Sequence, residues 1–166
     1  MCESFRVPGF RVTKYDPRER DEWGRFMRED WTGFGDVGKE FAGVVLTLAA
    51  YAEVEGRYLG AIAEFMRLAG VDSVEVQGLE HRGVDRQLDA AAALVAEGQR
   101  LDRAQALEVA QLNLREALWC RLVGAGGFYV HFGWDYYMYI GGDALPAAPP
   151  EIAGMFVEAF ASPYHE

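Results

Sequence analysis

The stretch GFYVHFGWDYYMYIGG, residues 127–142, decides the fold of this chain. Apolar and polar side chains alternate on either side of Gly133, and the Gly-Trp-Asp sequence in the middle is typical of a turn. The pattern therefore predicts a β-hairpin with two faces of different composition. One face would carry Phe128, Val130, Phe132, Tyr136, Met138 and Ile140, and the other Tyr129, His131, Tyr137 and Tyr139.

Two helices are predicted on the N-terminal side of this hairpin. Apolar residues recur every three or four positions over residues 48–69, between a Thr47 N-cap and a Gly70 that ends the helix. A second helix begins at the capping box formed by Asp102 and Gln105, and its apolar stripe continues to Leu122.

Shorter patterns complete the predicted fold. Residues 10–14 and 74–79 alternate like strands, residues 43–47 form a β-branched run typical of a short buried strand, and residues 154–160 predict a last strand. The alanine-rich residues 81–101 favour a third helix. Together these patterns predict a single α+β domain over residues 1–166, with a mostly antiparallel sheet packed against two or three helices.

Composition and length place the chain among globular proteins. Of its 166 residues 51% are hydrophobic and 25% are charged. The N-terminus lacks the apolar core of a signal peptide, and the longest uncharged runs, residues 41–52 and 122–134, are shorter than the roughly 20 residues that span a bilayer. Cys2 and Cys120 are too far apart in the sequence to suggest a disulfide framework. We therefore expect a cytoplasmic protein without membrane association.

The net charge of −10 is distributed unevenly along the chain. Residues 122–166 contain five acidic residues and no lysine or arginine. This balance argues against a nucleic-acid ligand, because such binding depends on basic residues that neutralise phosphates. It favours a basic protein partner, although excess acid also keeps a protein soluble. Both interpretations of the charge stay open at this point.

No motif in the chain declares a reaction. The sequence contains neither a Gly-x-Ser-x-Gly elbow nor a glycine-rich phosphate loop, so we expect no nucleotide cofactor. His81, His131 and His165 lack the spacing of metal ligands, and no metal is expected. A Cys120–His131 pair is a weaker interpretation than a small buried cysteine.

Three carboxylates of the chain allow one enzymatic interpretation. Glu80, Asp135 and Glu158 would converge at one end of the predicted sheet, where paired carboxylates can act as acid and base. The alternative is a small hydrolase or transferase that uses His131 with Asp135 or Glu80. The catalytic residues stay unassigned, and the sequence favours a binding protein over an enzyme.

The polar face and turn of the hairpin contain the candidate binding residues. In one interpretation helices or loops cover both faces, and the rings fill a core. In the other, one face is partly open and binds a partner, because Tyr and Trp dominate interface hot spots and His can make a contact sensitive to pH. The candidates are Tyr129, His131, Trp134, Asp135, Tyr137 and Tyr139, of which Trp134 and Asp135 at the turn are expected to be exposed.

Several motifs resemble those of an uncharacterised bacterial family. They are KYDP, WT followed by a Gly-Asp loop, LWC, FYVHFGWDYYMYIG and FVE-x-F-x-SPY, at residues 14–17, 31–36, 118–120, 128–141 and 156–164. The resemblance to this family does not indicate an activity. The general character of a small acidic α+β protein without a catalytic signature is similar to that of immunity proteins. This likeness implies a protein-binding domain that neutralises a basic toxin or effector through an acidic, aromatic surface.

Overall fold

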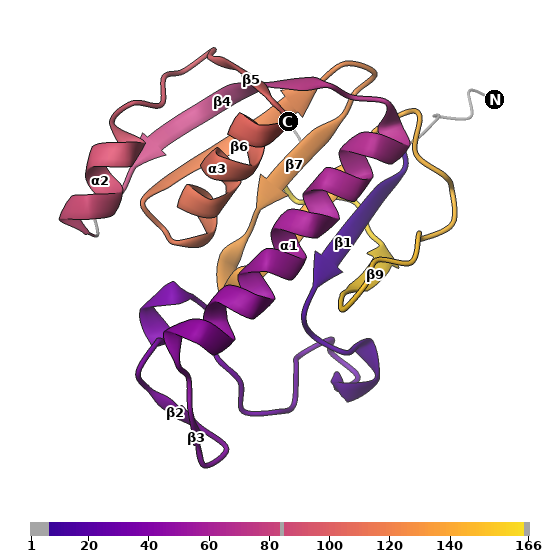
Figure 1. Ribbon diagram of the computed structural model, residues 1–166. Coiled ribbons are helices and arrows are strands. Elements are labelled where there is room, and N and C mark those ends of the chain that lie inside the picture. The colour runs from indigo at the N-terminus through magenta and orange to yellow at the C-terminus, as the bar shows by residue number, and fades with distance from the viewer. Residues whose placement is uncertain (1–6, 84, 165–166) are drawn as a thin grey trace.

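The central sheet is built around the predicted hairpin. The computed structural model describes residues 7–83 and 85–164, and its largest sheet has seven strands in the order β5-β4-β6-β7-β8-β1-β9 (Figure 1). All neighbouring strands in it are antiparallel. The strands are β1 (Gly9–Thr13), β4 (Ser73–His81), β5 (Arg100–Asp102), β6 (Leu118–Gly124), β7 (Tyr129–Phe132), β8 (Met138–Gly141) and β9 (Phe156–Ala159).

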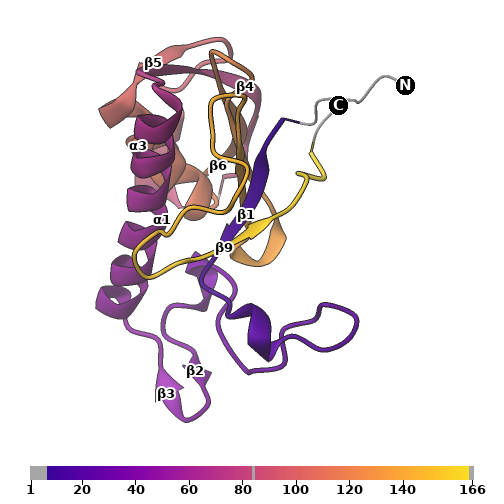
Figure 2. The same cartoon turned by 90° about the vertical axis from the view of Figure 1, so that its right-hand side faces the viewer.

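Two helices, α1 (Leu48–Ala69) and α3 (Arg103–Leu114), cover one face of this sheet (Figure 2). The Thr47 side chain accepts a hydrogen bond from the Ala50 amide at 3.1 Å, and Gly70 ends α1 in the left-handed conformation with φ 67°. Both predicted caps of α1 are confirmed. The α1 side chains packed into the core include Tyr51, Tyr58, Ile62 and Phe65.

The hairpin has the predicted alternation of faces. Val130 lies opposite Ile140, and both are buried on the side of the helices. His131 lies opposite Tyr139 on the other face of the sheet. Gly141 is needed on that face, because an added Cβ would lie 2.5 Å from the Tyr129 ring.

The predicted helix that begins at the capping box ends earlier than expected. The box itself is present, but α3 stops at Leu114, and residues 118–124 form β6 instead of continuing the helix. Leu118 and Leu122 are four residues apart, a spacing that fits one face of a helix and equally one face of a strand. Cys120 is buried between them, and this alternation is that of a strand.

Two other predictions were wrong in extent or burial. The helix expected over residues 81–101 shrinks to α2 (Arg86–Ala92), because the chain then returns to pair β5 with the edge of β4. The run at residues 43–47 contains β3 (Val44–Val45), which pairs only with β2 (Glu40–Phe41) in a separate two-stranded ribbon. Val44 and Val45 are exposed, because this ribbon is not part of the main sheet.

The fold class is the predicted one, an α+β domain with an antiparallel sheet and three helices. Within the described residues no helix has the length and apolar character needed to cross a membrane. Cys2 and His165 lie outside the described residues.

A buried ion pair joins the two helices that cover the sheet. Glu55 of α1 is 2% exposed, and its carboxylate accepts two hydrogen bonds of 2.9 Å from Arg115. The side-chain amide of Gln111 donates a third at 2.8 Å. These bonds position the C-terminal end of α3 against α1. Glu116 is the next residue in the chain after Arg115.

We expect Glu55→Gln to lower the free energy of unfolding by about 3 kcal/mol, because it leaves the Arg115 guanidinium without its counter-charge. Glu53→Gln is the matched control, since Glu53 pairs with Arg57 at the surface of the same helix. The control should cost less than about 0.5 kcal/mol. Urea unfolding of the two variants measures both values, and equal losses would contradict the role of the buried pair.

Candidate functional site

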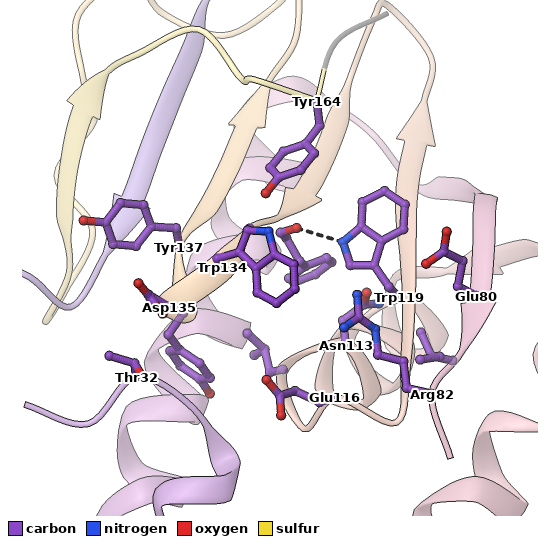
Figure 3. A pocket seen from close by; sticks show the side chains of 15 residues that line it. Thr32, Glu80, Arg82, Asn113, Glu116, Trp119, Trp134, Asp135, Tyr137 and Tyr164 are labelled. Carbon is purple, nitrogen blue, oxygen red and sulfur yellow. Dashed lines mark hydrogen bonds between the residues drawn. The ribbon is translucent and has the colours of Figure 1, made fainter. Parts of the chain in front are cut away.

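A cavity of about 270 Å³ opens at the end of the sheet where the β7–β8 hairpin turns (Figure 3). Six parts of the chain line it: Thr32, the end of β4 with Arg82 after it, the end of α3 with Glu116 after it, the start of β6, the hairpin turn, and Tyr164. We call it the Trp134 cavity. Its walls combine aromatic rings with carboxylates.

Two indole rings form the most prominent walls. The Trp119 Nε1 donates a 2.8 Å hydrogen bond to the Phe132 carbonyl oxygen, which fixes this ring against β7. The Tyr164 ring lies 6.1 Å from Trp119, measured between centroids. Trp134 is 75% exposed at the tip of the turn, and the Arg82 guanidinium lies 5.8 Å from the centre of its ring.

Three carboxylates border the same cavity. Glu80, Glu116 and Asp135 are exposed, and none of them forms an ion pair with a basic group of the described residues. Arg82 is the single basic residue among the described residues of the lining. The lining therefore has a formal charge of −2, from three acids and one base.

Unusual backbone conformations gather around this cavity. Glu116, Asp135 and Tyr136 have φ values of 62°, 58° and 66°, in the left-handed region that residues with a Cβ avoid. The described residues contain one more such non-glycine position, Ala42 in the β2–β3 turn. Strained backbone of this kind persists only where surrounding contacts hold it, and it clusters at functional sites.

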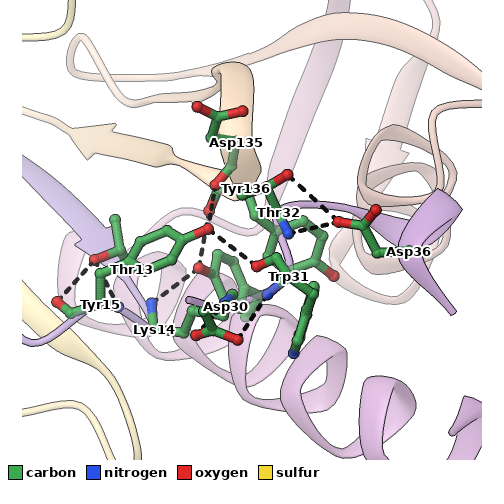
Figure 4. A network of polar contacts seen from close by, with 10 residues as sticks. Thr13, Lys14, Tyr15, Asp30, Trp31, Thr32, Asp36, Asp135 and Tyr136 are labelled. Carbon is green, nitrogen blue, oxygen red and sulfur yellow. Dashed lines mark hydrogen bonds and ion pairs between the residues drawn. The ribbon is translucent and has the colours of Figure 1, made fainter. Parts of the chain in front are cut away.

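Hydrogen bonds from the hydroxyl groups of buried tyrosines hold the strained turn. Tyr15 donates a 2.6 Å hydrogen bond to the Asp135 carbonyl oxygen, as Figure 4 shows. Tyr58 donates a 2.8 Å bond to the Tyr136 carbonyl oxygen, and the Tyr136 hydroxyl donates to that of Tyr51 at 2.9 Å. Tyr136 thus points into the core while Trp134 points outward.

A buried lysine ties the loop before the cavity to the sheet. The Lys14 ammonium group lies 2.7 Å from the Asp30 carboxylate and 4.2 Å from the ring centres of both Tyr15 and Trp31. Burial lowers the pKa of Lys14, an effect that Asp30 partly offsets. The loop continues to Thr32, whose amide donates to Asp36 at 2.8 Å at the edge of the cavity.

The structure separates the predicted binding residues into two groups. Trp134, Asp135 and Tyr137 line the Trp134 cavity together with Glu80, and Trp134 and Asp135 are exposed as expected. Tyr129, His131 and Tyr139 are buried, which agrees with the interpretation in which this face is covered and not with the one in which it is partly open.

The segment after β9 covers this second group. His131 is 3% exposed, and its Nδ1 lies 2.6 Å from the hydroxyl oxygen of Ser162, which is itself buried. Tyr129 stacks on His131 at 4.4 Å, and Tyr139 contacts the rings of Phe160 and Tyr164. These contacts attach the C-terminal segment to the sheet, and they leave the His131–Ser162 pair without the access to solvent that a nucleophile and its base need.

The other sequence-based candidates are dispersed. Glu158 of β9 pairs with Arg11 at the edge of the sheet, five strands away from the β4 strand that carries Glu80, and it does not line the cavity. Cys120 contacts Asn113 on the helix side, and burial raises the pKa of its thiol to about 11. Within residues 7–83 and 85–164, no group of three or more His, Cys, Asp and Glu residues could hold a metal ion.

The predicted site residues did not include Arg82, Glu116, Trp119 and Tyr164, which also line the cavity. Trp119 was placed on a helix, where its direction could not be assigned. The burial of Leu118, Cys120 and Leu122 in alternation would have placed Trp119 on the opposite face, had the strand been recognised.

Comparison of this chain with protein-family models, with curated proteins and with solved structures finds no match.

We expect Glu116→Gly to raise the free energy of unfolding by about 0.5–1 kcal/mol, because glycine adopts the left-handed conformation without a Cβ clash. Glu108→Gly is the control, since Glu108 is an exposed residue inside α3. That control should lose about 1 kcal/mol through the low helix propensity of glycine. Chemical unfolding measures both, and the same sign for the two changes would contradict strain at Glu116.

The buried tyrosines predict a loss of stability at high pH. Burial raises the pKa of Tyr15, Tyr51, Tyr58 and Tyr136 above their ordinary value of 10.0. An acid with a raised pKa contributes stability that is complete below pH 10.0 and is lost as the unfolded chain ionises above it. Lys14, with a pKa lowered from 10.5, works in the opposite direction but is one group against four.

Above pH 10 we therefore expect the free energy of unfolding to fall by roughly 1.4 kcal/mol per pH unit for each buried tyrosine. Urea unfolding at increasing pH measures this slope, and tyrosinate absorbance reports ionisation. Ionisation of all eight tyrosines in the still folded protein near pH 10.0 would contradict the prediction.

Proposed function

We propose that this protein binds a basic protein partner through the acidic, aromatic surface around the Trp134 cavity. The observation that carries the proposal is Trp134 itself, a large ring that is 75% exposed on a turn held by buried hydrogen bonds. Tryptophan loses little conformational entropy on binding for the large area that it buries, and it is enriched at interface hot spots.

Charge supports a basic partner rather than an acidic one. Glu80, Glu116 and Asp135 border the Trp134 cavity without basic partners of their own among the described residues. Complementary charge accelerates association and disfavours acidic competitors. The net charge of −10 extends this attraction beyond the cavity.

Within this proposal the protein acts like an immunity protein and blocks a toxin or effector. The general resemblance in size, acidity and fold type supports this choice. A hydrolase or transferase that uses His131 is not proposed, because His131 is buried beneath the C-terminal segment and does not line the cavity.

The test begins with a photocrosslinking amino acid in place of Arg82, an exposed residue of the cavity lining, introduced into the full chain in its native host so that Trp134 stays intact. The crosslinked protein is identified and purified, and a complex of the two purified proteins is measured by calorimetry. The proposal expects a binary complex that weakens with rising salt, because screening reduces the attraction between its charges. Failure of the two purified proteins to bind would overturn it.

Trp134→Ala should weaken that complex by roughly 30-fold, the effect of a hot-spot side chain. Trp23→Ala is the matched control, because Trp23 is 73% exposed on a loop outside the cavity. The control should change the affinity by less than about threefold. Equal effects of the two changes would contradict a binding surface at Trp134. Unchanged thermal unfolding of both variants excludes a loss of fold.

A further inference from the structure

We propose that the Trp134 cavity binds the guanidinium group of an arginine side chain, and that Arg82 occupies this place in the free protein. The inference rests on the proposed function, because the arginine would belong to the partner. It specifies the residue type that the cavity recognises. It also identifies Arg82 as a side chain of the same protein that competes with the partner's arginine for the cavity.

The aromatic walls suit a flat cation. Trp119 is fixed by its hydrogen bond to the Phe132 carbonyl oxygen, and the Tyr58 bond to the Tyr136 carbonyl oxygen holds the backbone of the turn that carries Trp134. A guanidinium stacks on an indole face through cation–π attraction and planar contact. The Arg82 guanidinium already lies 5.8 Å from the centre of the Trp134 ring, which shows that this face accepts the group (Figure 3).

The carboxylates suit the donors of a guanidinium. Arginine presents five N–H donors in a rigid fork, and carboxylates accept them in pairs. Glu80, Glu116 and Asp135 surround the cavity and make no ion pair with the described basic residues, Arg82 included. A lysine ammonium is more strongly hydrated and cannot stack in the same way, so arginine fits this lining better.

Arg82 can leave its place at low cost. Its side chain is exposed and forms no ion pair with a described residue, while its backbone amide stays bonded to the Ala117 carbonyl oxygen at 3.2 Å. A second guanidinium in the cavity would be repelled by Arg82 until that side chain swings away. Removal of the Arg82 charge changes the formal charge of the lining from −2 to −3, by the loss of one base.

The test uses a blocked Gly-Arg-Gly peptide as the probe, with matched peptides in which lysine or neutral citrulline replaces arginine. Nuclear magnetic resonance follows the indole N–H signals of Trp119 and Trp134 in the full-length protein. The arginine peptide should shift both signals, and the citrulline peptide should bind at least about tenfold more weakly because it lacks the charge. Equal binding of the two peptides would overturn the proposal.

Arg82→Gln should strengthen binding of the arginine peptide by about threefold to fivefold, because it removes the competing cation. Glu116→Gln should weaken binding by a similar factor. Arg100→Gln is the control, since it changes the net charge of the protein equally from β5, outside the cavity, and should leave the affinity unchanged. A loss of affinity in Arg82→Gln would overturn the assignment of Arg82 as a competitor.

The two proposals fail separately. A partner complex that depends on Trp134 and coexists with no response to the arginine peptide would overturn the guanidinium site alone. Binding of the peptide at both indoles, without any complex between the two purified proteins, would overturn the proposed protein partner alone.

Discussion

Two hydrogen bonds from buried tyrosines hold the feature on which the rest of this structure depends. The hydroxyl groups of Tyr15 and Tyr58 donate to the consecutive carbonyl oxygens of Asp135 and Tyr136, inside a turn where both residues are left-handed. Without these donors two buried or half-buried carbonyl groups would lack partners, and the strained turn would have no compensation. The two hydrogen bonds hold this turn of the hairpin in one backbone conformation.

The aromatic side chains of this short stretch lie in three different environments, in the turn and on either side of it. Tyr136 joins the core beneath α1, Tyr129 and Tyr139 are covered by the C-terminal segment, and Trp134 projects into solvent. The question of whether this stretch fills a core or forms a surface thus has a different answer at each position. The surface is the turn, and it coincides with the cavity and its carboxylates.

Local patterns predicted much of the fold and part of the cavity. The α1 caps, the capping box of α3 and the alternation in β7 and β8 depend on neighbours within a few residues, and all are present. The prediction failed between Leu114 and Leu122, where a four-residue spacing fits both helix and strand. Because the sequence predicted a helix there, the predicted site did not include Trp119.

The sequence by itself determined which side chains share a face within each element, where α1 begins and ends, and that Trp134 and Asp135 lie at a turn. These properties follow from backbone periodicity and capping, which act over a few residues. Only the tertiary structure decided that the C-terminal segment covers His131 and that Arg82, Glu116, Trp119 and Tyr164 meet at Trp134. Such meetings depend on strand order and on packing between distant segments, which no local pattern specifies.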